Sequence, residues 1–254
     1  MVCGRDRRQS VQSESMVSQN IIRRFYPDNS KDGAVAFYKW VRQITTERTI
    51  MLNVGAGPPA IRGPIRVFRG EVARVVGVDI DPAVMGNMEL DEAYCISDNC
   101  ELPFADNTFD VAVGDWVMEH VQHPHLLLSE VRRVLRKGGS FFFRTPSKYH
   151  YVTLIARCTP HWFHKLVANW ARGCPPEQHD PWPTYYRLNS RTEVEAEGRK
   201  AGFERVELRN WEWEPGYLVF HEIPFVFGVA YERIVNRYEV LSPLRHSILA
   251  RMTK

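Results

Sequence analysis

The chain has 254 residues, of which 44% are hydrophobic and 25% are charged, and its formal net charge is +3. These fractions are those of an ordinary globular protein, and they exclude a disordered tail, a collagen-like repeat and a disulfide miniprotein. Because a single core is near its usual upper size at this length, we expect one domain with insertions. The charge excess is too small to indicate nucleic acid as a partner.

Neither the cysteines nor the hydropathy pattern indicates an oxidising compartment or a membrane. The odd number of cysteines and the absence of a CxxC pair favour reduced thiols and argue against a zinc site. Residues 1–15 lack the apolar stretch of a secretory signal. No apolar run reaches the roughly 18–20 residues that span a bilayer. We therefore expect a cytoplasmic protein with no bound metal and no membrane partner.

Alternating apolar runs and amphipathic stretches indicate a parallel α/β sheet with helices on both faces. Strands are expected at residues 50–54, 74–79, 93–96, 109–113, 140–145, 206–211 and 246–252. Helices are expected at residues 30–46, 126–135, 190–201 and 224–238. Sheets of this kind bind ligands beyond the carboxyl ends of their strands.

Capping residues mark two of these helices, and composition divides the chain. Ser30 is the expected N-cap of the first helix, and Ser190 with Glu193 forms a capping box closed by Gly202. We expect the following organisation: a mobile lead-in at 1–15, and a single domain at 16–254 that includes N-terminal helices at 16–47 and a lid insertion at 146–189.

The first strand ends in a loop built for close approach of a ligand, Asn53-Val-Gly-Ala-Gly-Pro-Pro-Ala60. As a bare pattern it matches the dinucleotide fingerprint G-x-G-x-x-A, with Asp79 near the expected spacing for a ribose-binding acid. Pro58 and Pro59 argue against a dinucleotide, because proline has no N–H group to hold a pyrophosphate. The glycines still permit close approach to the backbone, so the loop predicts a nucleoside-like ligand.

Acidic residues follow the second and third strands. Asp79 can accept hydrogen bonds from both ribose hydroxyls, whereas Asp81 before Pro82 suits a turn or a helix cap better. The loop of residues 97–100 offers an acid that can accept from an adenine amino group. Phe104 is open to two interpretations, as core packing or as part of an adenine pocket.

Five segments occur in one order and at compatible spacings: NVGAGPP, VVGVDIDP, SDNCELPFADNTFDVAV, VMEHVQHP and VLRKGGSFFFRTPS. Together they resemble the class I S-adenosylmethionine-dependent methyltransferases, particularly the small-molecule branch. The resemblance is strong over residues 48–146 and is carried by pattern over 186–211. It implies a doubly wound, seven-stranded Rossmann-like sheet with an antiparallel last strand, and S-adenosyl-L-methionine as the cofactor.

The resemblance also implies which residues contact this cofactor. The glycine loop would lie against its methionine part, with Asp79 at the ribose. The predicted contacts are Asn53, Gly55, Ala56, Gly57, Asp79, Ile80, Asp98, Asn99, Cys100, Asp115 and Trp116. Asn53 stands where the family has an acidic residue, so contact with the cofactor's ammonium group would lack a charge.

The segment after the fourth strand lies, in this family, beside the sulfonium that carries the methyl group. A methyltransferase mainly supplies proximity and in-line alignment, and it needs a base only when the acceptor is protonated. His120 and His123 are the candidate bases, although Glu119 and His120 can instead stiffen a helix. The pair is similar to part of a metal-binding ExxEH motif, but Trp116 occupies the first ligand position and cannot ligate.

Residues 146–189 are rich in proline and aromatic side chains, and we expect them to form a substrate lid, because a connection this long is usually functional. The predicted substrate contacts are Tyr38, His150, Tyr151, His161, Tyr185 and Tyr186. Taken singly, each of the five lid residues is better explained as satisfied packing, and only the segment as a whole indicates a lid. Tyr38 belongs to the N-terminal helix, which is equally open to closing the same cleft or to ordinary packing on the sheet.

The sequence therefore predicts methyl transfer from S-adenosylmethionine to an oxygen or nitrogen of a small-molecule metabolite, such as a natural product or a sugar-containing intermediate. The alternative is a partner protein that keeps the cofactor fold without turnover. Methylation of RNA or protein is disfavoured, because the chain has no appended basic domain. The identity of the acceptor and the oligomeric state are not specified by the sequence.

Overall fold

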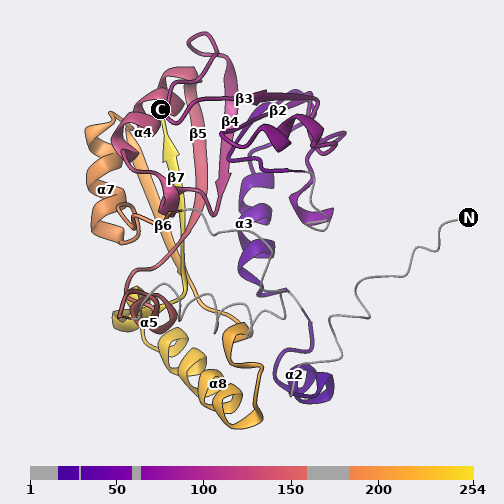
Figure 1. The fold of residues 1–254 in the computed structure, drawn as a ribbon, viewed down its shortest axis with the longest axis vertical. Helices are drawn as coiled ribbons and strands as arrows, with labels where there is room; N and C mark the ends of the chain where they lie inside the picture. Colours follow the sequence, from indigo (N-terminus) through magenta and orange to yellow (C-terminus); the bar gives the residue numbers. More distant parts are fainter. Residues whose placement is uncertain (1–16, 29, 59–63, 159–182) are drawn as a thin grey trace, which may run out of the picture.

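The computed structural model describes residues 17–28, 30–58, 64–158 and 183–254 (Figure 1). Its centre is a seven-stranded sheet with the strand order β3-β2-β1-β4-β5-β7-β6. The strands are β1 (Ile50–Val54), β2 (Arg74–Asp79), β3 (Glu92–Cys95), β4 (Phe109–Asp115), β5 (Leu135–Pro146), β6 (Arg205–Trp211) and β7 (Ser247–Thr253). Only β7 runs antiparallel to its neighbours. The predicted fold class is confirmed.

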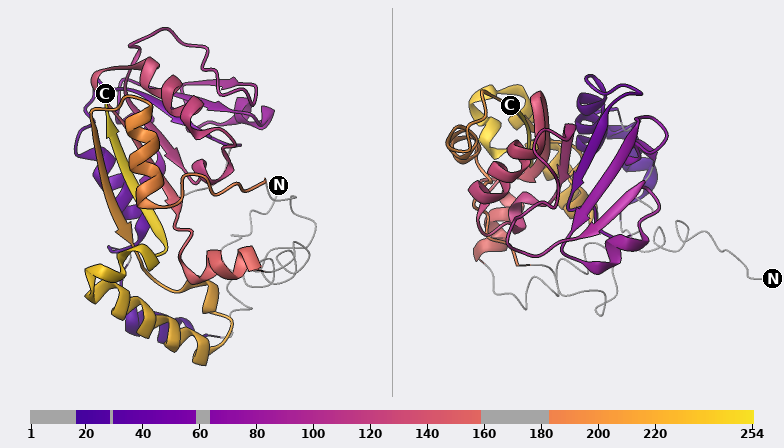
Figure 2. Two further views of the ribbon diagram at one scale, coloured as in Figure 1. Left: turned by 90° about the vertical axis from the view of Figure 1, so that its left-hand side faces the viewer. Right: turned by 90° about the horizontal axis from the view of Figure 1, so that it is seen from above.

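Helices cover both faces of the sheet, and others lie beyond one end of it (Figures 1 and 2). The described α-helices are α2 (Gln19–Phe25), α3 (Gly33–Arg42), α4 (Pro124–Val134), α5 (Tyr151–Cys158), α7 (Arg191–Lys200) and α8 (Glu222–Arg237). The short 3-10 helices are η1 (Pro64–Arg66), η2 (Pro82–Gly86), η3 (Met118–His120), η4 (Gly216–Leu218) and η5 (Glu239–Leu244). Helix α3 packs on one face, and α4 and α7 pack on the other.

The strand β5 shows how the sheet is buried from both sides. Phe141 and Phe143 belong to the core beneath α4 and α7, whereas Phe142 packs edge-on against Trp40 of α3, with ring centroids 5.3 Å apart. Because successive side chains of a strand point to opposite faces, three consecutive phenylalanines serve two cores. The sheet can therefore hold its carboxyl edge rigidly on both faces.

The two predicted helix caps have different outcomes. Ser190 accepts a hydrogen bond from the N–H group of Glu193, and Gly202 has a φ of +87°, so the cap and stop of α7 are confirmed. The prediction of Ser30 as the N-cap of the first helix is wrong. Asp32 takes this role, because its Oδ1 accepts from the N–H groups of Ala34 at 2.6 Å and Val35 at 3.2 Å.

Helices α2, α5 and α8 gather beyond the carboxyl ends of the parallel strands (Figures 1 and 2). Tyr26 after α2 packs against Phe225 of α8 and against Trp213, with the Trp213 ring centroid 4.6 Å away. The predicted lid at 146–189 begins with α5, while residues 159–182 and the predicted lead-in lie outside the described residues. The carboxyl edge of the sheet is thus covered by segments from both ends of the chain.

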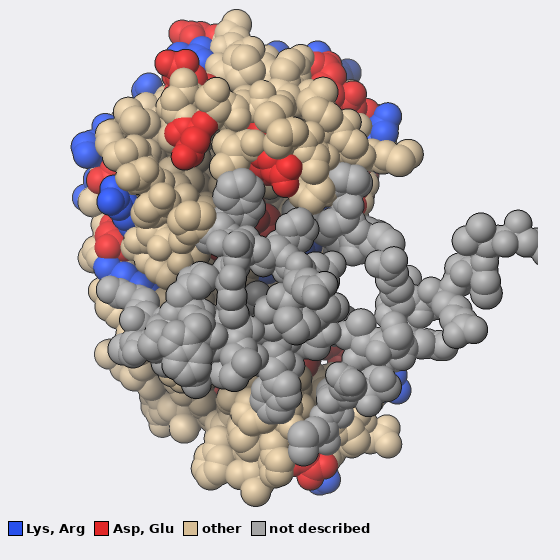
Figure 3. Space-filling model, in the orientation of Figure 1, with Lys and Arg blue, Asp and Glu red and all other residues tan. Residues whose placement is uncertain are grey.

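The surface gives two further facts. In the described part of the face in Figure 3, Lys and Arg are interspersed with Asp and Glu around the rim. Of the helices that the structure describes, none has both the length and the apolar composition required to cross a bilayer.

Candidate functional site

The glycine loop after β1 has a backbone that only glycine accommodates easily. Gly55 and Gly57 have φ values of +67° and +68°. The N–H groups of Gly55 and Ala56 both donate to the carbonyl of Val78, at 2.8 and 3.1 Å. A Cβ atom on Gly55 would lie only 2.2 Å from Cγ2 of Val117. The loop is therefore held tightly against the ends of β2 and β4.

Two polar side chains fasten this loop, one at the end of β2 and one directly after η2. The carboxylate of Asp79 accepts from the N–H groups of Gly57 at 2.7 Å and Asp81 at 2.9 Å. The buried amide of Asn87 donates to the carbonyls of Ala56 and Gly57, at 3.3 and 3.1 Å. A carboxylate has about four acceptor sites, so Asp79 keeps acceptors for a ligand's hydroxyl groups. Asn87 was not predicted from the sequence.

A buried carboxylate at the end of β4, Asp115, collects four donors. Arg144 of β5 binds it through two nitrogens, at 2.7 and 2.9 Å. The hydroxyl of Tyr38 donates to it at 3.0 Å, and Nη1 of Arg66 lies 3.1 Å away. Burial and the neighbouring Asp115 charge raise the pKa of Tyr38 above its ordinary value. We call these four residues the Asp115 cluster; it joins β4, β5, α3 and η1.

Trp116, directly after β4, has an unusual backbone for a bulky residue. Its φ is +60°, in the left-handed region that costs free energy for every residue except glycine. The N–H group of Trp116 donates to the carbonyl of Arg144 at 3.0 Å, and the Arg144 guanidinium lies 4.9 Å from the centre of the indole. These contacts hold the turn, and the turn directs the indole into a cavity.

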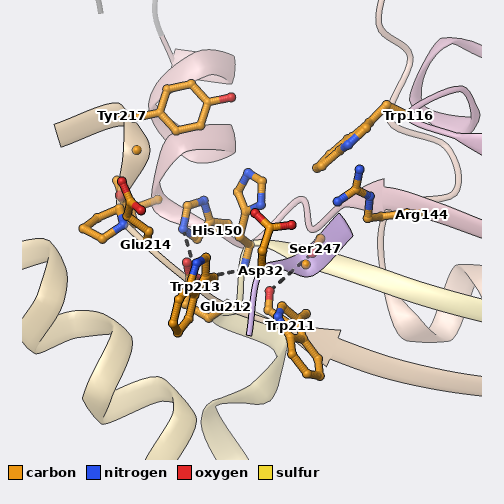
Figure 4. A pocket seen from close by; sticks show the side chains of 15 residues that line it. Asp32, Trp116, Arg144, His150, Trp211, Glu212, Trp213, Glu214, Tyr217 and Ser247 are labelled. Carbon is orange, nitrogen blue, oxygen red and sulfur yellow. Dashed lines mark hydrogen bonds and ion pairs between the residues drawn. The ribbon is translucent and has the colours of Figure 1, made fainter. Parts of the chain in front are cut away.

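This cavity has a volume of about 190 Å³ and lies among β4, β5, the end of β6 and the start of β7 (Figure 4). Its aromatic wall consists of Trp116, Tyr151, Trp211, Trp213 and Tyr217. Its ionisable groups are Asp32, Arg144, His150, Glu212, Glu214 and His246. Tyr217 and Glu214 lie on the side opposite Trp116 and Arg144 (Figure 4). The wall therefore combines segments from five distant parts of the chain.

Three ionisable side chains meet at the base of the cavity: Glu212 and His150 are buried, and His246 is half-buried. The Glu212 carboxyl accepts a hydrogen bond from the backbone N–H group of His246 at 2.8 Å. Its Oε2 also lies 3.3 Å from the ring nitrogen Nε2 of His150. Burial raises the pKa of Glu212 to about 7 and lowers the pKa values of His150 and His246 to about 3 and about 4. At neutral pH both imidazoles are thus uncharged, and the Glu212 carboxyl is poised between its two protonation states.

Another buried acid, Glu119 of η3, lies where the predicted lid returns to the sheet. Its carbonyl accepts from the N–H groups of Tyr185 and Tyr186, at 2.8 and 3.3 Å. Its carboxyl accepts from the hydroxyl of Thr145 at 3.3 Å. Burial raises the pKa of Glu119 to about 7. In the same place, Nδ1 of His120 lies 2.9 Å from the carbonyl of Pro183.

The structure brings some predicted site residues together and leaves others apart. Trp116, His150 and Tyr151 line the cavity. His120, His123, Tyr38, Tyr185 and Tyr186 are absent from its wall, and His161 lies outside the described residues. The hydroxyl of Tyr38 is instead engaged by Asp115.

The predicted adenine contacts form a separate, more exposed group after β3. Asp98 and Asn99 are exposed, and the side chain of Asn99 accepts from the N–H group of Glu101 at 3.1 Å. Cys100 has a φ of +65° and packs against the core, and burial raises the pKa of its thiol. Ile80 is 37% exposed beside Asp79. This edge is open to a ligand that reaches across from the glycine loop.

Most of the polar cavity wall was missed from the sequence. The missed residues are Asp32, Arg144, Trp211, Glu212, Trp213, Glu214, Tyr217 and His246. One signal was present, since the run Trp-Glu-Trp-Glu at 211–214 alternates aromatic and acidic residues directly after a strand.

Residues 52–143 match a family model described as a methyltransferase domain. The match spans the glycine loop, the Asp79 loop and the turn at Trp116. This part of the chain therefore carries a methyltransferase domain, within a sheet whose strand order is typical of the class I S-adenosylmethionine-dependent methyltransferases. Among curated relatives of this chain, a sterol 4-C-methyltransferase from Caenorhabditis elegans is 28% identical over 194 residues, which are 69% of this chain and 51% of that protein. An uncharacterized methyltransferase from Mycobacterium is 34% identical over 134 residues, or 50% of this chain and 52% of that protein.

The chain spans about half the length of these first curated relatives. Solved structures share its fold. The [4+2]-cyclase SpnF superposes with a TM-score of 0.54 at 18% identity, covering 86% of this chain and 80% of that one. A possible histamine N-methyltransferase from Thermotoga maritima superposes with a TM-score of 0.55 at 14% identity, covering 92% and 95%. At these identities the likeness concerns the fold alone.

Replacing Gly55 tests how tightly the glycine loop is packed. We expect Gly55→Ala to lower the free energy of unfolding by about 2–4 kcal/mol, because it adds a clash with Val117 to the cost of a positive φ. Gly70→Ala is the matched control, since Gly70 has a φ of +83° with nothing near its missing Cβ. Equal losses in urea unfolding of the two variants would contradict the tight packing.

The buried carboxyl of Glu119 should make stability depend on pH. Its folded pKa of about 7 lies above the ordinary value of 4.5, so its contribution is complete below pH 4.5 and is lost as the pH rises through 7. We expect Glu119→Gln to remove a slope of up to about 1.4 kcal/mol per pH unit between pH 5 and 7. Urea unfolding of both proteins at several pH values measures this, and parallel pH profiles would contradict it.

Proposed function

We propose that the protein is an S-adenosylmethionine-dependent methyltransferase whose small-molecule acceptor binds in the aromatic cavity. One observation carries this proposal: two residues adjacent in the chain contact the glycine loop and the cavity. Val117 packs against Gly55, while Trp116, its neighbour in the chain, lines the cavity. A methyl donor bound at the loop and a methyl acceptor bound in the cavity would therefore meet at the end of β4.

The residues of the loops fit this cofactor. The open backbone at Gly55 and Gly57 permits close approach, and Asp79 keeps free acceptor sites for the ribose hydroxyls. Asp98 and Asn99 would contact the adenine. Arg66 shares Asp115 with Arg144 and is one-quarter exposed, so it can hold the carboxylate of the methionine part. When bound, S-adenosylmethionine supplies an activated methyl group on a sulfonium.

The chain itself contributes position and proton acceptance. The rigid turn at Trp116 orients the acceptor toward the loop, which replaces a bimolecular encounter by a fixed geometry. Glu212, poised near neutral pH and in contact range of His150, is better placed to accept a proton than His120 or His123, because it lines the cavity. Loss of a proton is needed for an oxygen or nitrogen acceptor.

The proton-accepting group supports an acceptor that loses a proton when it is methylated. Two relatives are named as C-methyltransferases, the sterol enzyme and a ubiquinone/menaquinone biosynthesis enzyme from Brucella suis that is 26% identical over 71% of this chain and 70% of that protein. We keep oxygen or nitrogen as the proposed acceptor atom, because a titratable carboxyl beside two neutral imidazoles can take the proton that a hydroxyl or ammonium loses, although methylation at carbon releases a proton as well.

A partner protein without turnover is the second candidate, and Asn53 favours it. This side chain offers no charge to the cofactor's ammonium group at a position where the family has an acid. Such a protein would bind S-adenosylmethionine without forming a methylated product with any acceptor, and a screen for a mass increase of one methyl group separates the two candidates.

Calorimetric titration with S-adenosylhomocysteine tests the cofactor site. We expect binding by the native protein and no binding of NAD. Asp79→Ala should weaken S-adenosylhomocysteine binding by about 1.5–3 kcal/mol, the range for hydrogen bonds to a charged group. Asp81→Ala serves as control, because Asp81 only caps η2. Unchanged affinity of Asp79→Ala would show that the ribose lies elsewhere.

A further inference from the structure

The composition of the cavity wall indicates what kind of acceptor it holds. Five aromatic rings line it together with three carboxyl side chains, those of Asp32, Glu212 and Glu214. Aromatic faces attract cations through their negative quadrupole, and carboxylates add direct charge attraction. We infer that the acceptor is an organic amine bound as its ammonium ion, an inference that rests on the proposed methyltransferase function.

The carboxylates of the wall are not neutralised by the basic residues that the structure describes. Within the described ranges, no Lys or Arg forms an ion pair with Asp32, Glu212 or Glu214. Arg245, whose charge reaches Glu212, is itself paired with Glu239 at 2.9 Å. Asp32 uses one oxygen to cap α3. Burial raises the pKa of Glu214, and repulsion from Asp32 raises it further.

Among the described residues that line the cavity, Arg144 is the one cationic side chain, and the charge of Asp115 already balances it. Arg144 forms a two-bond ion pair with Asp115, and both side chains are about 5% exposed. Its guanidinium also lies 4.9 Å from the centre of the Trp116 ring. The protein thus already places one cation against this ring, and the opposite side of the cavity, with Tyr217 and Glu214, holds the unbalanced charge (Figure 4).

An independent observation indicates that the cavity is built for a polar ligand. His150 is 2% exposed; its Nδ1 has no hydrogen-bond partner among the described residues, and its Nε2 has only the 3.3 Å approach of Glu212 Oε2, which lacks hydrogen-bond geometry. Buried polar atoms rarely remain without a partner. Since His150 lies on the cavity wall beside Glu212, an ammonium or amine group in the cavity would supply the missing hydrogen bond to a neutral imidazole.

Matched probes test the inference by binding alone. Phenethylamine, which is protonated at pH 7.5, is compared with the neutral 2-phenylethanol and the anionic phenylacetate, each titrated calorimetrically with and without saturating S-adenosylhomocysteine. We expect the ammonium probe to bind roughly tenfold or more tightly than the alcohol, with phenylacetate weakest. Equal or tighter binding of the alcohol would overturn the inference.

Variants tie the preference to the carboxylates. Glu214→Gln should weaken phenethylamine binding about tenfold while leaving 2-phenylethanol unchanged. Asp32→Asn, which keeps a capping side chain for α3, is a second variant expected to act in the same direction. Glu204→Gln, an exposed carboxyl between α7 and β6, is the control and should change nothing. An unchanged amine affinity in both Glu214→Gln and Asp32→Asn would overturn the inference.

The same titrations separate this inference from the proposed function. Binding of S-adenosylhomocysteine without a preference for the ammonium probe would leave the methyltransferase proposal intact and reject the amine acceptor. An ammonium preference without S-adenosylhomocysteine binding would reject methyl transfer and leave the cavity as an amine-binding site.

Discussion

The buried carboxylate of Asp115 is the interaction on which both halves of the site depend. It binds Arg144 of β5, Arg66 of η1 and Tyr38 of α3, and it thereby joins the central strand to three other elements. Such a group is costly to bury alone, and removing one partner leaves charge unpaired in a low-dielectric interior. Arg144 faces the cavity, whereas Tyr38 and Arg66 lie on the cofactor side beside β1. The Asp115 cluster therefore positions both the proposed methyl-donor region and the proposed methyl-acceptor cavity.

Residues with positive φ lie near the Asp115 cluster, on the side where the methyl donor would bind. Gly55 and Gly57 turn the chain after β1, and Trp116 turns it after β4, all with positive φ. Glycine adopts these angles at little cost, but tryptophan does not, so the turn at Trp116 persists because its N–H group and ring are both held by Arg144. This geometry matters for function, because it places the indole of Trp116 and the contact of Val117 with the glycine loop on the same short segment directly after β4.

The sequence alone was sufficient for the sheet and the glycine loop, because both depend on local patterns. Apolar runs alternate with amphipathic stretches, and the glycines and Asp79 stand at short, fixed spacings. The cavity wall depends instead on distant segments, so no local pattern revealed that Asp32, Glu212 and His246 meet. The wrong helix start has a similar cause. Both Ser30 and Asp32 can cap a helix, and the chain at this start is held by a distant residue, Trp211, whose indole N–H donates to the carbonyl of Lys31 at 2.7 Å.

The central claim is that one bound nucleoside and one acceptor cavity meet at the end of β4. A crystal structure of the protein with S-adenosylhomocysteine tests it most directly. The account predicts that the ribose hydroxyls contact Asp79, that the methionine carboxylate lies near Arg66, and that the sulfur atom faces the cavity past Trp116. A nucleoside seated within the aromatic cavity itself, or bound away from the glycine loop, would contradict the account.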